Sequence, residues 1–416
     1  MDTFVPSFIR EMNPNVKLTF FFSFFNSLGR GIWFGNVFSA YIYFIAGKSN
    51  ILLGWTSVAT GLTMTALVFP AGLMADRIRR DLALTISAVL GAISLAIMLA
   101  FGQDIYWIFV ALVFWGAFQG FNRPALEALL ADSIPTRRRS KTYVWLHLVR
   151  QIAMATGPFL NVFMFLFLGN EWDLSILRIV MIVGLLISAI SVFSLLFLDD
   201  DYALGKKSEA VELEVIQKNI NNNYKIRNVR LIVPAIILLS NLVVGMGAGM
   251  TIKFFPIFFI EVYSLKPITV QLIMGLTLVA TGLFALIARS FSLKRGRVLI
   301  IFILQSIATA CLLVIAFYPP LWALIPLFIA RGSLMNAGEP LSRSLIMDYV
   351  PKRYRGLFNS LQAIAWGLFW NFSAVIGGYL IGDNNRFYLC FFTTAGIYVV
   401  GVLLLLLILP YDIKEV

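Results

Sequence analysis

The sequence predicts an all-α membrane protein with twelve transmembrane helices in two similar six-helix bundles. Three observations support this fold class. Sixty per cent of the 416 residues are hydrophobic and only 13% are charged, whereas soluble proteins carry roughly a quarter charged residues. Apolar runs long enough to cross a bilayer, which needs roughly 20 helical residues, recur along the chain. Finally, the second half repeats motifs of the first half at a nearly constant spacing.

The apolar runs give the expected helices in chain order. They lie at 17–46, 51–75, 82–102, 105–132, 141–168 and 174–198 in the first half, and at 229–262, 267–290, 297–317, 320–348, 354–382 and 386–409 in the second. Each is long enough to span the hydrocarbon core as a helix. The one long polar segment separates the sixth run from the seventh.

The repeat defines the predicted domains. Pro124, Asp132 and Pro135 recur 216 residues later as Pro340, Asp348 and Pro351, and in each copy a basic cluster follows. Because the period is about half the chain, the repeating unit is a half-protein. We therefore predict an N-terminal bundle over 1–198, a cytoplasmic linker over 199–230 with one amphipathic helix, and a C-terminal bundle over 231–416.

The net charge of +12 comes from loops rather than from a nucleic-acid-binding face. Basic residues gather after the second, fourth, sixth, eighth and tenth runs, and the opposite loops hold few. The positive-inside rule then places both termini in the cytoplasm of a multi-pass cell-membrane protein. We expect a monomer in the lipid bilayer that does not bind nucleic acid.

Metal and catalytic chemistry find little support in the sequence. The two cysteines, Cys311 and Cys390, fall within apolar runs, and His147 is the only histidine, so a zinc or copper site and any other cofactor are not expected. No spacing typical of a nucleophile and its base occurs either. The sequence therefore predicts a protein that is not an enzyme.

The segment after the second run carries a family resemblance. Gly72-Leu73-Met74-Ala75-Asp76-Arg77-Ile78-Arg79-Arg80 resembles the loop signature between helices 2 and 3 of the major facilitator superfamily. Gly72, Asp76, Arg77 and Arg80 match it, whereas Arg79 replaces its second glycine. The resemblance implies twelve helices and transport, with a conformational relay of charges in this loop. Asp132 matches the acidic residue that joins this relay.

A second motif is similar to the drug/proton antiporter branch of that superfamily. Gly157-Pro158 resembles the branch's glycine-proline motif, but Asn161-Val162 stands where further glycines occur. The branch often carries an arginine in its fourth helix, but the corresponding region 116–120 has none, and Arg331 lies in the repeat-equivalent tenth helix. Proton coupling of the usual type therefore stays open.

Charged residues within spans give the candidate substrate-binding site, since such charges are expensive and usually functional. In superfamily members helices 1, 4, 7 and 10 line a central cavity. The resemblance therefore assigns Arg30, Lys253 and Arg331 to it, with Asn36 and Asn336 as polar neighbours. A cavity lined by these positive charges favours an anionic or zwitterionic organic molecule. The alternative is that these cations pair with carbonyls or snorkel.

The twin stretches predict a cytoplasmic gate. The fourth run offers Arg123 and Glu127, and the positions 216 residues later are Glu339 and Arg343, so the signs are exchanged. The resemblance to the superfamily implies an approximate twofold axis between the two halves, so equivalent residues near that axis would face each other. We expect cross-repeat pairs when the gate closes and pairs within each helix, four residues apart, when it opens.

Together these features predict a secondary transporter that works by rocker-switch alternating access, with a proton or another ion as a candidate coupling partner. Two alternatives remain on the same fold. One is a proton antiporter that exports drugs or amphiphiles. The other is a receptor or lipid scramblase that does not pump.

Overall fold

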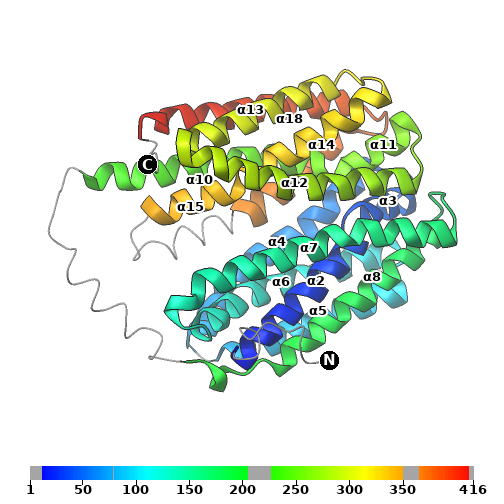
Figure 1. The fold of residues 1–416 in the computed structure, drawn as a ribbon. Coiled ribbons are helices and arrows are strands. Elements are labelled where there is room, and N and C mark those ends of the chain that lie inside the picture. The colour runs from blue at the N-terminus through cyan, green and yellow to red at the C-terminus, as the bar shows by residue number, and fades with distance from the viewer. Residues whose placement is uncertain (1–11, 78, 205–225, 350–364, 412–416) are drawn as a thin grey trace, which may run out of the picture. The chain divides into compact units, whose positions relative to one another are not determined.

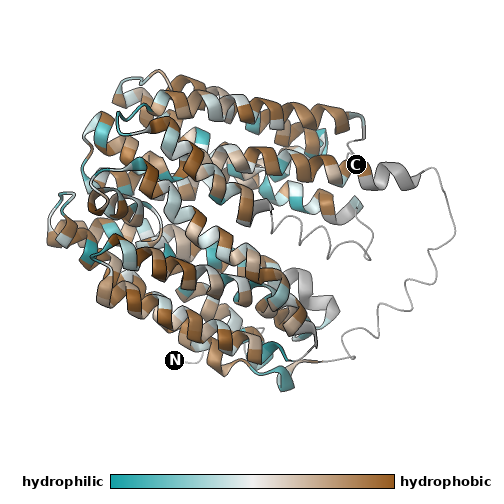
Figure 2. Ribbon diagram, turned by 180° about the vertical axis from the view of Figure 1, so that it is seen from behind, coloured by the Kyte–Doolittle hydropathy of each residue, from teal (hydrophilic) through white to brown (hydrophobic). Residues whose placement is uncertain are grey.

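The computed structural model describes residues 12–77, 79–204, 226–349 and 365–411. These residues form helices and no strand. Within them, ten helices are long and apolar enough to cross a membrane. Large apolar side chains cover their outer faces, as in Phe167 and Trp322, which are 89% and 79% exposed. Figure 2 shows this hydrophobic colouring along the helices and hydrophilic colouring at the loops. The predicted all-α membrane fold is confirmed.

The described residues of the first half form seven α-helices, which Figure 1 shows in colours from blue to green. The first predicted helix is divided into two, and the other five follow the predicted runs closely. In chain order they are α2 (Pro14–Trp33), α3 (Asn36–Ile45), α4 (Asn50–Arg77), α5 (Arg80–Phe101), α6 (Ile105–Asp132), α7 (Thr136–Leu168) and α8 (Leu174–Ser194), followed by the short 3₁₀ segments η1 (Leu195–Phe197) and η2 (Asp200–Tyr202).

The second half is interrupted more often. It contains α10 (Ile226–Thr251), η4 (Ile252–Phe254), α11 (Phe255–Tyr263), α12 (Pro267–Arg295), α13 (Arg297–Ile315), α14 (Leu321–Ala337), α15 (Glu339–Tyr349), η5 (Ala365–Phe369), α17 (Trp370–Ile381), α18 (Phe387–Leu404) and η6 (Leu405–Tyr411). The amphipathic helix that we predict in the linker falls largely on 205–225, outside the described residues.

Among the described residues, three interruptions lie where the sequence weakens the hydrogen-bond ladder of a helix. α2 and α3 are separated at Phe34 and Gly35. η4 separates α10 from α11 just before Pro256, which has no N–H to donate to Ile252. Pro340 likewise follows the junction of α14 and α15. The interruptions of the first and seventh helices fall at equivalent positions of the repeat, about 218 residues apart.

The chain packs as two compact units. Unit 1 comprises Met1–Val37, Leu62–Gly157 and Arg178–Asn222, and unit 2 comprises Phe38–Gly61, Pro158–Leu177 and Asn223–Val416. In unit 1, α5 packs along α6, and α2 also contacts α6. In unit 2, α10 packs against α17 and α18, and α14 packs against α12 and α13. The units cut across the repeats, whose boundaries remain a prediction from the sequence.

Glycines allow the closest backbone approaches in each unit. In unit 1, a Cβ on Gly157 of α7 would lie 2.3 Å from the backbone carbon of Gly31 on α2. In unit 2, a Cβ on Gly54 of α4 would lie 2.7 Å from the carbonyl oxygen of Ala374 on α17. Gly35, the second glycine of the GxxxG spacing that begins at Gly31, has open space instead. Only the first glycine of that spacing serves helix packing.

Candidate functional site

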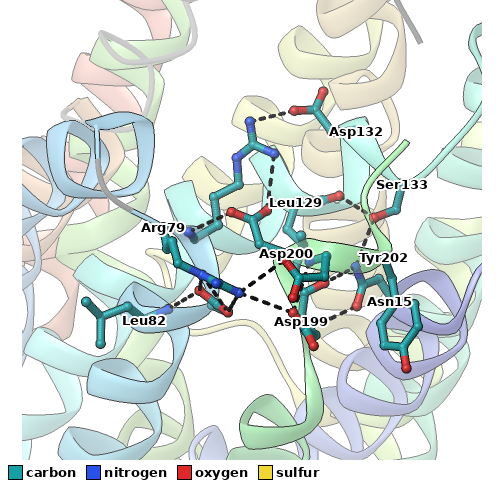
Figure 3. A network of polar contacts seen from close by, with 12 residues as sticks. Asn15, Arg79, Leu82, Leu129, Asp132, Ser133, Asp199, Asp200 and Tyr202 are labelled. Carbon is teal, nitrogen blue, oxygen red and sulfur yellow. Dashed lines mark hydrogen bonds and ion pairs between the residues drawn. The ribbon is translucent and has the colours of Figure 1, made fainter. Parts of the chain in front are cut away.

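A network of charges in unit 1 ties the start of α5 to the end of α6 and to the segment after α8 (Figure 3). The Arg80 guanidinium lies 2.5 Å from the Asp132 carboxylate and 3.5 Å from that of Asp200. Its backbone N–H also donates to Asp200 at 3.2 Å. Arg80 therefore holds two carboxylates that would otherwise repel each other.

Arg79 forms the more exposed half of this network. It donates to Asp81 at 2.6 Å and lies 3.3 Å from Asp199 and 3.6 Å from Asp201. The hydrogen bond and the charge of Asp81 raise the pKa of the Arg79 guanidinium further above its usual range. Because this group is exposed to solvent, its ion pairs contribute little stability.

Hydrogen bonds from a side-chain amide and from the backbone complete the same network. The Asn15 amide of α2 donates to the Asp199 carbonyl at 2.7 Å and to the Ser133 hydroxyl at 3.2 Å. The N–H of Leu204 donates to the Asp132 carbonyl at 2.8 Å. The segment 199–204 is thus docked onto the ends of three helices.

The predicted relay residues are only partly described. The structure brings Arg80 and Asp132 together, and it places Gly72 on α4 with Pro124 of α6 as its nearest neighbour. The side chains of Asp76 and Arg77 lie outside the described part of the chain. The acids from Asp199 to Asp201, which the sequence suggests are the start of a solvated linker, join the network. Their position directly after an apolar run, opposite a basic loop, is the signal that could have identified them.

We expect Arg80→Gln to destabilise unit 1 by about 1 kcal/mol, a modest loss because these side chains are a quarter to a third exposed and solvent screens them. Arg79→Gln, the control, should cost less than about half of that. Thermal unfolding in detergent measures both. Adding Asp132→Asn to Arg80→Gln should cost little more, since the pair is already broken. Equal losses of stability in Arg80→Gln and Arg79→Gln would contradict this interpretation. So would a stability loss from Asp132→Asn that simply adds to that of Arg80→Gln in the double variant.

Arg30 lies four residues before the interruption between α2 and α3. It is partly buried, its guanidinium carbon lies 5.1 Å from the centre of the Phe34 ring, and its buried Nε has no hydrogen-bond partner. Among the described residues no carboxylate pairs with it. Asn36, the other predicted residue here, begins α3. Arg30 is therefore a cation with unused hydrogen-bonding capacity at a helix interruption.

Lys253 lies inside the equivalent interruption, in η4 of unit 2. Its ammonium donates to the Thr56 hydroxyl at 3.1 Å and lies 5.9 Å from the centre of the Phe38 ring. Both neighbours belong to α3 and α4, so this lysine contacts first-repeat helices within unit 2. Within the described chain no carboxylate reaches it. An ammonium has three donors, so two remain for a ligand.

Arg331 on α14 is in a different environment. It is only 4% exposed, and its guanidinium donates to the Tyr398 hydroxyl at 2.9 Å and to the Thr251 hydroxyl at 3.3 Å. Two buried protein hydroxyls thus accept from one of its nitrogens, whereas its buried Nε has no partner. The neighbouring Asn336 donates to the Gly332 carbonyl at 2.8 Å and is exposed. The structure does not group Arg331 with Lys253 through any described side-chain contact.

The four predicted gate residues lie on α6 and α15. Glu339 and Arg343 pair four residues apart at 2.7 Å and are exposed. Glu127 lies 3.7 Å from Arg150 of α7, which also donates to Ser23 of α2 at 3.2 Å. Arg123 is exposed on α6. The partnership of Glu127 with Arg150 was not apparent from the sequence, because residues 23 apart on different helices share no spacing rule.

Polar contacts also join the repeats within unit 2. Lys48 pairs with Glu261 at 3.1 Å and Lys266 pairs with Glu171 at 2.7 Å. The Asn50 amide donates to Asn385 at 2.9 Å. These residues lie in or beside the loops that connect α3 to α4, α7 to α8, α11 to α12 and α17 to α18. They join residues of the first half to residues of the second half within unit 2.

The whole fold is similar to solved transporters. The nucleoside transporter NupG aligns over 96% of this chain and 100% of its own with 14% identity and a TM-score of 0.66. A bacterial homologue of the iron transporter ferroportin, in an inward-facing state, covers 94% of this chain and 98% of its own, at 12% identity and a TM-score of 0.69. A D-xylose-proton symporter covers 94% and 96%, at 15% identity and 0.69.

At such identities the likeness establishes the fold alone. No curated relative matches the sequence significantly. Residues 19–238 and 237–415 match the Major Facilitator Superfamily, whose members and the similar structures are transporters rather than enzymes. The predicted family resemblance is confirmed at this level, and the chain belongs to the major facilitator superfamily.

Proposed function

We propose that this protein is a secondary transporter for a small anionic or zwitterionic organic molecule, with Arg30 and Lys253 as the charged substrate contacts. The observation that carries the proposal is their shared position. Arg30 lies about one turn before the interruption of the first helix of its repeat, Lys253 lies inside the equivalent interruption, and no described carboxylate pairs with either. Interrupted membrane helices are where transporters of other folds hold their substrates.

The physical argument concerns the cost of these charges. A cation within a span is expensive unless something compensates it. Aromatic faces and one hydroxyl provide part of that compensation, through Phe34 for Arg30 and through Phe38 and Thr56 for Lys253. A carboxylate or phosphate would provide the rest through charge-assisted hydrogen bonds. This reasoning favours an anionic or zwitterionic substrate over a neutral one.

We propose a rocker-switch cycle with both termini in the cytoplasm, on the basis of the repeat and the basic loops. The charge network around Arg80 would brace the first repeat during that cycle. No described feature favours drug export, reception or lipid scrambling over transport. The coupling ion is left to experiment.

Uptake into proteoliposomes tests the substrate class. The panel contains radiolabelled lactate, alanine and glucose 6-phosphate, with uridine and xylose as neutral solutes of similar size. We expect at least one charged member to enter about tenfold faster than both neutral ones, since a charged hydrogen bond contributes roughly 1.5–3 kcal/mol. Protein-free vesicles and an imposed pH gradient provide the background and the coupling test. Faster entry of uridine or xylose would overturn the charge argument.

A further inference from the structure

We propose that Arg331 is a positioning residue that fixes the interruption between α10 and α11 and thereby places Lys253. The inference rests on the proposed role of Lys253 in substrate binding. It separates Arg331 from the substrate contacts with which the sequence grouped it.

The contacts of Arg331 reach both edges of η4. Its guanidinium donates to Thr251, the last residue of α10, at 3.3 Å. The guanidinium carbon also lies 4.8 Å from the ring centre of Phe255, the first residue of α11. Lys253 is the central residue of the three between these two contacts. One side chain from α14 therefore holds the ends of both helix segments.

Tyr398 of α18 holds Arg331 in turn. Its hydroxyl accepts from the guanidinium at 2.9 Å, and its ring lies 5.8 Å from the guanidinium carbon. The ring packs so closely on α10 that a Cβ on Gly247 would lie 2.8 Å from it. Tyr398 and Phe255 are both almost fully buried. The guanidinium therefore contacts two buried aromatic side chains, which is a suitable setting for it in an apolar interior.

The same face of α18 satisfies carbonyls near the end of α10. Cys390, Thr394 and Tyr398 follow each other at four-residue intervals, so they lie on one face. The Cys390 thiol donates to the Met250 carbonyl at 3.2 Å, and the Thr394 hydroxyl donates to the Gly247 carbonyl at 3.4 Å. Backbone groups left without helical partners inside a membrane need such donors. Side chains of α18 and α14 thus hold the backbone around the interruption, and Arg331 is the charged residue among them.

A direct substrate ligand would have a different environment. Arg331 is 4% exposed and lies among protein groups, whereas Lys253 is partly exposed. The buried Nε of Arg331 has no partner, but the guanidinium lies beside the side chains of Phe255 and Tyr398, both of which are almost fully buried. We therefore expect its removal to change substrate affinity through Lys253 rather than independently.

Hydrogen–deuterium exchange tests the restraint without any substrate. In Arg331→Met and Tyr398→Phe, the backbone amides of 250–255 should exchange about tenfold faster than in the unmodified protein, which corresponds to about 1.4 kcal/mol for one restraining hydrogen bond. Tyr388→Phe, which removes a more exposed hydroxyl from the same helix, is the control and should leave these amides unchanged. Unchanged exchange in both Arg331→Met and Tyr398→Phe would overturn the proposal. Tyr398→Phe keeps the ring, so it tests the restraint even if Arg331→Met does not fold.

A double-mutant cycle separates positioning from direct binding. With the fastest charged panel solute, Arg331→Met should raise KM about tenfold and change kcat much less, and it should have little further effect when Lys253→Met is already present. If the increases in KM caused by Arg331→Met and Lys253→Met instead multiply in the double variant, Arg331 is a separate substrate ligand. If no panel solute is transported, the proposed substrate class fails, while the exchange measurement still decides the role of Arg331.

Discussion

Lys253→Met is expected to lower uptake of the charged panel solutes about 10- to 100-fold, because one charge-assisted hydrogen bond contributes roughly 1.5–3 kcal/mol. Methionine has a similar length and no charge, so it fills the space beside Phe38 without placing a cation there. The cost of holding an uncompensated charge in the span also disappears. The variant should therefore fold at least as well as the unmodified protein while transporting far less.

Two further variants identify which property of Lys253 matters. Lys253→Arg retains the charge and should keep most of the uptake, and Thr56→Val removes the hydroxyl that the ammonium contacts at 3.1 Å. Thr56→Val should affect uptake only modestly if the ligand binds the free donors of the ammonium. Uptake rates over a range of solute concentrations measure each effect. Normal transport by Lys253→Met would show that this lysine does not contact the substrate.

Most of the fold follows from hydropathy and the repeat. The run predicted at 105–132 forms α6 (Ile105–Asp132), and the run from 267 forms α12 (Pro267–Arg295). The helix interruptions could not be predicted this way, since apolar residues continue across Gly35 and across Lys253. Gly35, Pro256 and Pro340 were the local signals. Their meaning depends on whether neighbouring helices satisfy the freed backbone groups, which one sequence does not reveal.

The candidate sites were less predictable, because a depth along a helix does not fix the direction of a side chain. Spacing placed Arg331 and Lys253 at similar depth. The partners that distinguish them lie far away in sequence: Arg331 contacts residues 80 and 67 positions away, and Lys253 contacts one 197 positions away. The contact between Arg80 and Asp132 was easier to predict, because each residue lies at a helix end and a family motif connects them.

Glu339→Arg is expected to lower transport about tenfold or more, since like charges facing each other across a closing gate cost several kcal/mol. In the structure Glu339 pairs with Arg343 of its own helix at 2.7 Å, and Glu127 lies near Arg150. We propose that Glu339 pairs with Arg123, and Arg343 with Glu127, in the state with a closed inner gate. The exchange of signs between the repeats is the reason for this proposal, because pairs confined to one helix would not need it.

Charge swaps distinguish the two arrangements because they predict opposite results. Glu339→Arg with Arg343→Glu restores a pair within α15 but places like charges across the gate, so it should transport no better than Glu339→Arg alone. Glu339→Arg with Arg123→Glu restores the cross-repeat pair and should recover part of the uptake, limited by the new like charges four residues apart in each helix. Reversing all four charges restores every pair among these four residues and should recover more of it, limited by the loss of the ion pair between Glu127 and Arg150. If the swap within α15 rescues transport and the cross-repeat swap does not, these residues stabilise their own helices and form no gate.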